Sequence, residues 1–171
     1  MRAILALLLA GPPPDPAPLN DGVVAFARAR LGQQVGDGQC TDLAVGALRA
    51  AGARPNRGGR GWGEELPTFR DARPGDILQF EGAVFVHRGR LPGGAVVIRT
   101  ARYAHHTAIV ATVRGRAGSL RMTVLHQHAT LAGEDEADHR IVKEWDLNPA
   151  ELRRGTVTAY RPVADRPADP P

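Results

Sequence analysis

The sequence predicts an α+β fold in which two N-terminal helices pack on an antiparallel β-sheet. The 171 residues, 43% of them hydrophobic, are enough to enclose one core. Apolar residues recur at helical spacing only before residue 52, and segments rich in Val, Ile and Thr follow from residue 76. Because no helical pattern separates these later segments, we expect hairpin connections and hence an antiparallel sheet.

The first helix is expected to start at a cap formed by Asn20 or Asp21 and to end at Gly32. The second helix should run from Cys40 or Thr41 to Ala51. Its apolar face, which we expect to pack on the sheet, consists of Leu43, Ala44, Ala47 and Leu48.

Seven later segments have the composition of strands and are bounded by Gly or charged residues. They are residues 76–80, 83–87, 95–100, 106–113, 121–129, 141–145 and 156–160. The sequence GRAGS at 115–119 is expected to join two of them as a hairpin.

The two ends of the chain are expected to lie outside the folded domain, which we place at residues 19–163. Residues 1–18, MRAILALLLAGPPPDPAP, combine one arginine, a short apolar run and a proline-rich spacer, which is the layout of a secretory signal. We therefore expect a secreted or periplasmic protein. The proline-rich residues 164–171 are expected to form a disordered tail.

The charge pattern excludes several classes of partner. The net charge is +4 and the basic residues are almost all arginine, scattered along the chain with Lys143 as the only lysine. Aromatic residues make up 5% of the chain, so the sequence lacks the basic stripe with interleaved aromatics that nucleic-acid binding requires. No later apolar run approaches the roughly 20 residues that span a bilayer, so we expect no membrane insertion after removal of the signal. Nothing in the sequence indicates an oligomeric state.

Cys40 is the only cysteine, which excludes an intrachain disulfide and a multi-cysteine zinc site. It lies where a glycine-rich loop becomes a helix, and a helix N-terminus lowers the pKa of a thiol. Cys40 is therefore either a small buried hydrophobe or a reactive thiol. Gly36 and Gly38 in the preceding loop could let a substrate backbone approach, and Gln34 could donate a hydrogen bond to an oxyanion.

Four of the six histidines form two pairs, His105-His106 and His126-x-His128. On a strand, residues two apart share a face, so His126 and His128 should point the same way and Gln127 the opposite way. If the two strands pair, imidazoles from both can meet across the sheet. A thiol, a base and a group that orients the base are the minimum set for acyl transfer.

Four motifs, in their order along residues 21–129, resemble those of the papain-like CHAP and NlpC-type cysteine amidohydrolases and peptidases. They are GQCTDLA, RPGDILQF, HTAIV and VLHQHA. Many of these enzymes cut peptide or amide bonds in peptidoglycan. A similar variant of the fold, at the end of some fungal cytoskeletal proteins and in uncharacterised plant proteins, also has GD, HTA and LHQ-like elements.

The resemblance implies that Cys40 is the nucleophile and His106 the general base. The base-orienting residue would be His126, with His128 as the next candidate. A CHAP pattern has an acid and an asparagine at these two places, whereas NlpC-type enzymes use a histidine. Gln34 matches the spacing of a papain-like oxyanion donor, with Gln33 or Gln39 as alternatives.

The sequence therefore predicts a cysteine hydrolase that needs no cofactor and acts on peptide or peptidoglycan-type amide bonds. In such an enzyme we expect a thiolate paired with an imidazolium. Two alternatives stay open. A catalytically silent member of the fold would bind a peptide or a partner, and His106, His126 and His128 could instead hold a zinc ion in a hydrolase.

Overall fold

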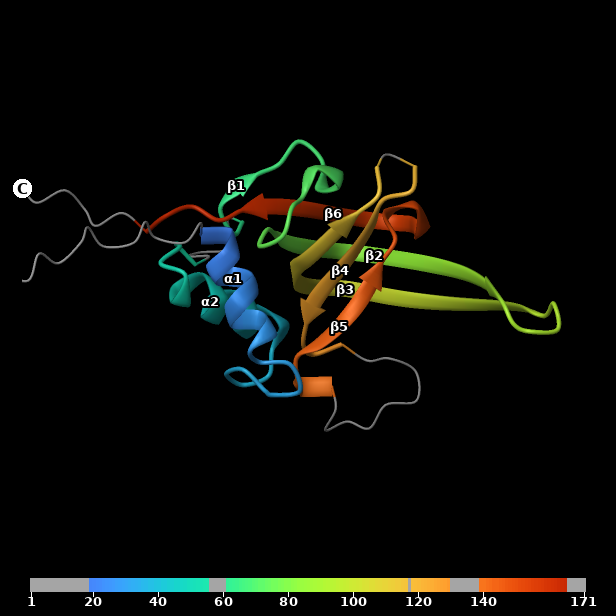
Figure 1. Cartoon of the computed structure of the whole chain (residues 1–171), viewed down its shortest axis with the longest axis horizontal. Helices are drawn as coiled ribbons and strands as arrows, with labels where there is room; N and C mark the ends of the chain where they lie inside the picture. The colour runs from blue at the N-terminus through green and yellow to red at the C-terminus, as the bar shows by residue number, and fades with distance from the viewer. Residues whose placement is uncertain (1–18, 56–60, 117, 130–138, 166–171) are drawn as a thin grey trace, which may run out of the picture.

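The computed structural model describes residues 19–55, 61–116, 118–129 and 139–165, and shows two helices packed on a six-stranded antiparallel sheet (Figure 1). The helices are α1 (Leu19–Arg28) and α2 (Cys40–Ala50). The strands are β1 (Glu64–Glu65), β2 (Ile77–Arg90), β3 (Val96–Arg114), β4 (Arg121–His126), β5 (Lys143–Leu147) and β6 (Leu152–Arg161). Short 3-10 helices include η1 (Phe69–Asp71) and η3 (Pro149–Glu151). The α+β fold predicted from the sequence is confirmed.

The sheet has the strand order β1-β6-β2-β3-β4-β5, so β2 and β3 lie at its centre. The two predicted segments at 76–80 and 83–87 form the single strand β2. Its register with β6 shifts at a bulge between Glu81 and Val84, whereas its register with β3 is continuous. Gly155 of β6 approaches this bulge so closely that a Cβ there would collide with the carbonyl oxygen of Gly82. The segments at 95–100 and 106–113 likewise form one strand, β3. β2 and β3 extend as a long hairpin beyond the rest of the sheet (Figure 1).

Helix α1 differs from the prediction at both ends. Asn20 lies inside the helix rather than capping it, and its side chain donates to Pro74 O at 2.7 Å and to Asp76 Oδ1 at 2.9 Å. The helix ends at Arg28, four residues before Gly32, because Leu31 already pairs with Val142 in an isolated β-bridge. Tertiary contacts therefore decide both ends.

Helix α2 confirms the prediction. Leu43, Ala44, Ala47 and Leu48 are all buried, and Arg49 is exposed. These side chains pack with Ile77, Ile109 and Leu125, which project from β2, β3 and β4 on the helix-covered face of the sheet. The opposite face carries a second, aromatic core that includes Phe69, Phe80, Phe85 and Tyr103.

Asp76, at the start of β2, ties the two ends of the domain together. Its fully buried carboxylate accepts hydrogen bonds from Asn20, from the Arg73 backbone N–H and from Arg161. Such a buried, paired charge holds structure rather than reacting.

The C-terminal boundary lies slightly later than predicted. Ala164 forms a β-bridge with Ala53, and the Asp165 N–H donates to Gly52 O at 3.0 Å, so the expected tail begins with two ordered residues. The expected signal at residues 1–18 and the rest of the tail fall outside the described residues. In the part of the chain described, no helix is long and apolar enough to cross a membrane.

Candidate functional site

The half-buried Cys40 is the first residue of α2. Asp42, in the first turn, accepts hydrogen bonds from the backbone N–H groups of Asp37 at 2.9 Å and Gln39 at 3.1 Å. This carboxylate also complements the positive end of the helix dipole. The start of the helix, and with it the position of Cys40, is therefore held by the loop that precedes it.

Gln127 fastens the same loop to the end of β4. Its buried side chain donates from Nε2 to Val35 O at 2.9 Å and to Gln39 O at 2.6 Å, and Oε1 accepts from Val35 N at 3.1 Å. Gln127 thus makes three hydrogen bonds to backbone on either side of the turn before Cys40. The same residue follows His126 directly, so one short segment positions both the loop before Cys40 and a histidine.

His106 and His126 meet across β3 and β4, as expected from the sequence. His106 Nε2 lies 3.0 Å from His126 Nδ1, and both residues are almost completely buried. The His106 ring also stacks on Tyr103, with 4.8 Å between the ring centroids. Because the hydrogen bond uses Nε2, the nitrogen Nδ1 of His106 is left for a second partner.

Burial sets the protonation state of His106. Loss of water around the ring, which is the main cause, and the neighbouring His126 and His128 together lower its pKa to about 3. The ring is therefore neutral at physiological pH. The imidazolium expected from the sequence is not supported, because burial disfavours the charged form of the ring.

His128 departs from the prediction that it shares a face with His126. Strand β4 ends at His126, and His128 adopts a left-handed conformation with φ 58°, so the alternation of the strand no longer applies. As a result His126 is buried whereas His128 is exposed. Gln127 does point away from His126, as predicted.

Cys40, His106 and His128 line one cavity of about 800 Å³ between the start of α2 and the strands β2, β3 and β6. Gln39, Trp62 and Tyr160 contribute further walls. Among the residues that the structure describes, no hydrogen bond joins Cys40 to the ring of His106, whose partner is His126. Catalytic hydrogen bonds are often long in the absence of substrate.

Gln34 does not line this cavity. Its Nε2 donates to Gly36 O at 3.0 Å, so in this conformation the amide is engaged within its own loop. Gln39, one of the alternatives considered for the oxyanion donor, does line the cavity. The structure thus brings Cys40, His106 and His128 to the cavity, places His126 behind His106, and leaves Gln34 outside.

Gly36 and Gly38 were expected to let a substrate backbone approach, but contacts within the protein explain them instead. A Cβ on Gly36 would lie 2.9 Å from the Asp42 carboxylate, and one on Gly38 would lie 2.8 Å from the Arg140 side chain. Both residues also have positive φ. They let the loop close on its own neighbours, so an approaching substrate is not needed to explain them.

A polar network that the sequence did not reveal forms the wall across from Cys40. Gln79 accepts from Trp62 Nε1 and from Thr107 Oγ1, each at 2.9 Å, and donates to Glu81 Oε1 at 3.1 Å. Glu81 Oε2 lies 2.8 Å from His105 Nδ1. Gln79 and Glu81 alternate along β2, and that alternation was the signal available in the sequence.

The negative charge of this wall acts on Tyr160. Burial raises the pKa of its hydroxyl, Glu65 and Glu81 raise it further, and a hydrogen bond with Thr158 opposes the change. Glu81 is thus an anionic feature of the Cys40 cavity.

The zinc alternative gains no support from the arrangement of side chains. Within the described ranges, no three His, Cys, Asp or Glu residues form a group able to hold a metal ion. His106 and His126 instead each use one ring nitrogen in the hydrogen bond that joins them.

A sheet covered by a helix that begins with a cysteine, beside a strand histidine supported by a second polar residue, defines the class of papain-like cysteine-proteinase folds. Residues 19–168 match the family described as the AIM3/BBC1 cysteine proteinase-fold domain, and the chain belongs to this family. Searches of curated proteins and of solved structures found no match. The family supports the broad superfamily expected from the motifs, but not the narrower CHAP or NlpC assignment.

Proposed function

We propose that the protein is a thiol-dependent hydrolase of amide or peptide bonds, with Cys40 as nucleophile and His106 as general base. The observation that carries this proposal is the shared cavity, in which Cys40 at a helix N-terminus and His106, itself hydrogen-bonded to His126, are both found. A nucleophile, a base and a residue that orients the base are thereby gathered on three different elements.

The tautomer of His106 follows from this role. To accept a proton at Nδ1, the neutral ring must carry its own proton on Nε2 and donate it to His126 Nδ1. His126 is then the positioning residue, because it fixes both the tautomer and the orientation of the ring. The low pKa of His106 means that the proton is taken during attack rather than held in a resting ion pair.

In the proposed reaction, Cys40 Sγ attacks the carbonyl carbon of the substrate as its proton passes to His106 Nδ1. The negative charge that develops on the carbonyl oxygen is stabilised by the N–H groups at the start of α2, with the side-chain amide of Gln39, which lines the same cavity, as a further donor. The amine leaves with the proton from His106, and water then hydrolyses the thioester with the same histidine as base.

The substrates proposed are peptides, with cell-wall peptides as the expected class and a secreted protein as the expected context. An open cavity of about 800 Å³, lined by both aromatic and polar side chains, is large enough for several groups of a peptide.

The test is acyl transfer from an activated ester, p-nitrophenyl acetate, with mass spectrometry of the Cys40 peptide. The native protein should show a burst of p-nitrophenol and an acetyl group on Cys40, since the thioester forms before it is hydrolysed. Cys40→Ser should abolish the burst and His106→Gln should slow it about 100-fold or more. His87→Gln, an exposed histidine paired with Glu151 outside the cavity, is the matched control.

Two results would replace the proposal. Absence of acylation in the native protein would favour the hypothesis of a catalytically silent, peptide-binding member of the fold. The low pKa of His106 is compatible with that hypothesis. Hydrolysis that survives Cys40→Ser but stops with a chelator would favour a metal-dependent mechanism.

A further inference from the structure

One face of the β2–β3 hairpin combines arginines with exposed aliphatic side chains. Arg88 lies directly opposite Ile98, and Arg90 directly opposite Val96, so all four project from the same face. Ile98 and Val96 are each 58% exposed, and Leu91, which follows β2 directly, is 49% exposed. Exposed aliphatic side chains are common singly on a folded domain, but they mark interaction sites when they cluster.

The outer part of the hairpin, beyond Glu81, carries positive charge without any compensating acid of its own. From Gly82 to Gly133 the sequence contains no Asp and no Glu. On the face that carries Val96 and Ile98, arginines occupy positions 88, 90 and 102, whereas Arg99, opposite His87, belongs to the other face. The partner of this face must therefore be anionic if charge is to be complementary.

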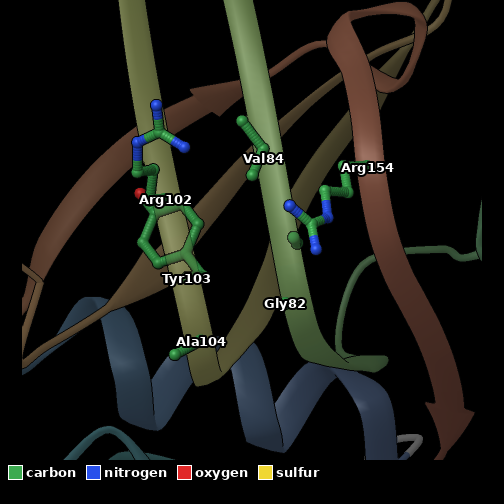
Figure 2. Close-up of a pocket in the computed structure, with 7 residues that line it drawn as sticks. Gly82, Val84, Arg102, Tyr103, Ala104 and Arg154 are labelled. Carbon is green, nitrogen blue, oxygen red and sulfur yellow. The ribbon is translucent and has the colours of Figure 1, made fainter.

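The arginines continue to the base of the hairpin. Val84 of β2 pairs with Arg102 of β3 on one side and with Arg154 of β6 on the other. Figure 2 shows these two arginines on the strands that flank Val84, around a hollow of about 270 Å³. Both are exposed, and neither forms an ion pair with any residue that the structure describes.

We propose that this face docks on a lipid bilayer rich in anionic phospholipids. The arginines bind headgroup phosphates, with Arg102 and Arg154 flanking one of them, while Val96 and Ile98 enter the boundary between headgroups and acyl chains. The projection of the hairpin beyond the rest of the sheet lets this end reach a surface without obstruction (Figure 1).

A bilayer is favoured over a soluble polyanion by the aliphatic side chains. A nucleic acid or an acidic peptide would use the arginines but would gain little from Ile98 and Val96 beside them. A bilayer interface stabilises both the arginines and the aliphatic side chains, because arginine can keep its guanidinium among the headgroups while its stem and the aliphatic side chains leave water.

The docking face lies on the same side of the sheet as the Cys40 cavity. Phe80, Ala83 and Phe85 of β2 point into the aromatic core, so Val84 projects from the opposite face, as do Gln79 and Glu81 of the cavity. Docking would therefore bring the cavity toward the bilayer and toward substrates held there. Only this consequence rests on the proposed hydrolase function; lipid binding itself does not.

The test is flotation of the full chain with vesicles of phosphatidylcholine alone and of phosphatidylcholine mixed with phosphatidylglycerol. We expect binding only to the mixed vesicles, weakened by salt. The double variant R88E/R90E should lose about 25-fold or more in partition, at about fivefold per arginine. The double variant V96S/I98S should lose about tenfold although its charge is unchanged. In the Ile98→Trp protein, anionic vesicles should shift the tryptophan emission to shorter wavelength.

The matched control is R114E/R121E, which makes the same change of charge at the other end of β3. There Arg114 of β3 lies directly opposite Arg121 of β4. The control should retain most of the binding, and Cys40→Ser should bind as the native protein does. Equal loss in R114E/R121E would reduce the effect to net charge and overturn the proposal. Unchanged binding in V96S/I98S, together with equal affinity for heparin or DNA, would assign the face to a soluble polyanion instead.

Discussion

Gln127 offers the sharpest test of how the site is held, because one side chain makes three hydrogen bonds to the loop before Cys40. Gln127→Glu keeps the shape of the side chain but replaces its amide donor with an oxygen. At neutral pH that oxygen would face the carbonyl oxygens of Val35 and Gln39, which now lie 2.9 and 2.6 Å from Nε2. The substitution therefore turns two attractive contacts into repulsive ones without removing any packing.

The magnitude follows from those contacts. Two lost hydrogen bonds cost about 1 kcal/mol each, and the buried carboxylate and the unpaired carbonyls add about 1 to 3 kcal/mol of desolvation. We expect a loss of about 3 to 5 kcal/mol in the free energy of unfolding at neutral pH. Because a protonated carboxyl can donate one hydrogen bond again, the difference from the native protein should shrink as the pH falls.

Urea denaturation followed by tryptophan fluorescence, at neutral and at acidic pH, measures this difference. The matched control is Gln34→Glu, the same chemical change on an exposed side chain of the same loop, which should stay within about 0.5 kcal/mol of the native protein. The native-state alkylation rate of Cys40 should also change in Gln127→Glu and not in the control. A loss below about 1 kcal/mol at neutral pH, or one that does not depend on pH, would refute the role given to Gln127.

Three further predictions concern single residues. The folded chain keeps His106 neutral down to about pH 3, whereas the unfolded chain protonates it near pH 6.5. The free energy of unfolding should therefore fall as the pH drops through this window, and at about pH 4.5 it should be about 3 kcal/mol lower than at neutral pH. His106→Gln should lack that share of the slope in urea denaturation, and an identical slope would contradict the buried neutral ring. Asp76→Asn should cost about 3 kcal/mol in the same assay, because Arg161 and Asn20 lose their buried carboxylate, and a cost below about 1 kcal/mol would contradict its structural role. At Cys40, a cationic methanethiosulfonate should react faster than an anionic one, and Glu81→Gln should lower that ratio at least about threefold; an unchanged ratio would show that the Glu81 charge is not felt at the thiol.

The parts of the structure that follow from local periodicity could be predicted from the sequence. The prediction of the buried face of α2 was correct at every residue, because four apolar side chains at helical spacing leave only one face that can pack on the sheet. The meeting of His106 and His126 was also predictable, since pairing of their strands through a short connection brings the two rings to one face.

The features that were missed depend on contacts between distant parts of the chain or on where a strand stops. Gln127 binds backbone about 90 positions earlier, and nothing in its own neighbourhood indicates that. The position of His128 could not be read from alternation, because β4 ends two residues before it. Burial of His106, which determines its charge, comes from side chains on other strands such as Phe80 and Trp145 near the His pair.

The central claim, that the cavity activates Cys40 through His106, is tested most directly by the rate of iodoacetamide alkylation of Cys40 as a function of pH. The native protein should be alkylated faster at mildly acidic pH than the same protein unfolded in urea, and His106→Gln should lose that excess. Because Cys40 is the only cysteine, mass spectrometry reads the rate without ambiguity. Equal rates for native and unfolded protein at every pH, unchanged by His106→Gln, would contradict the account.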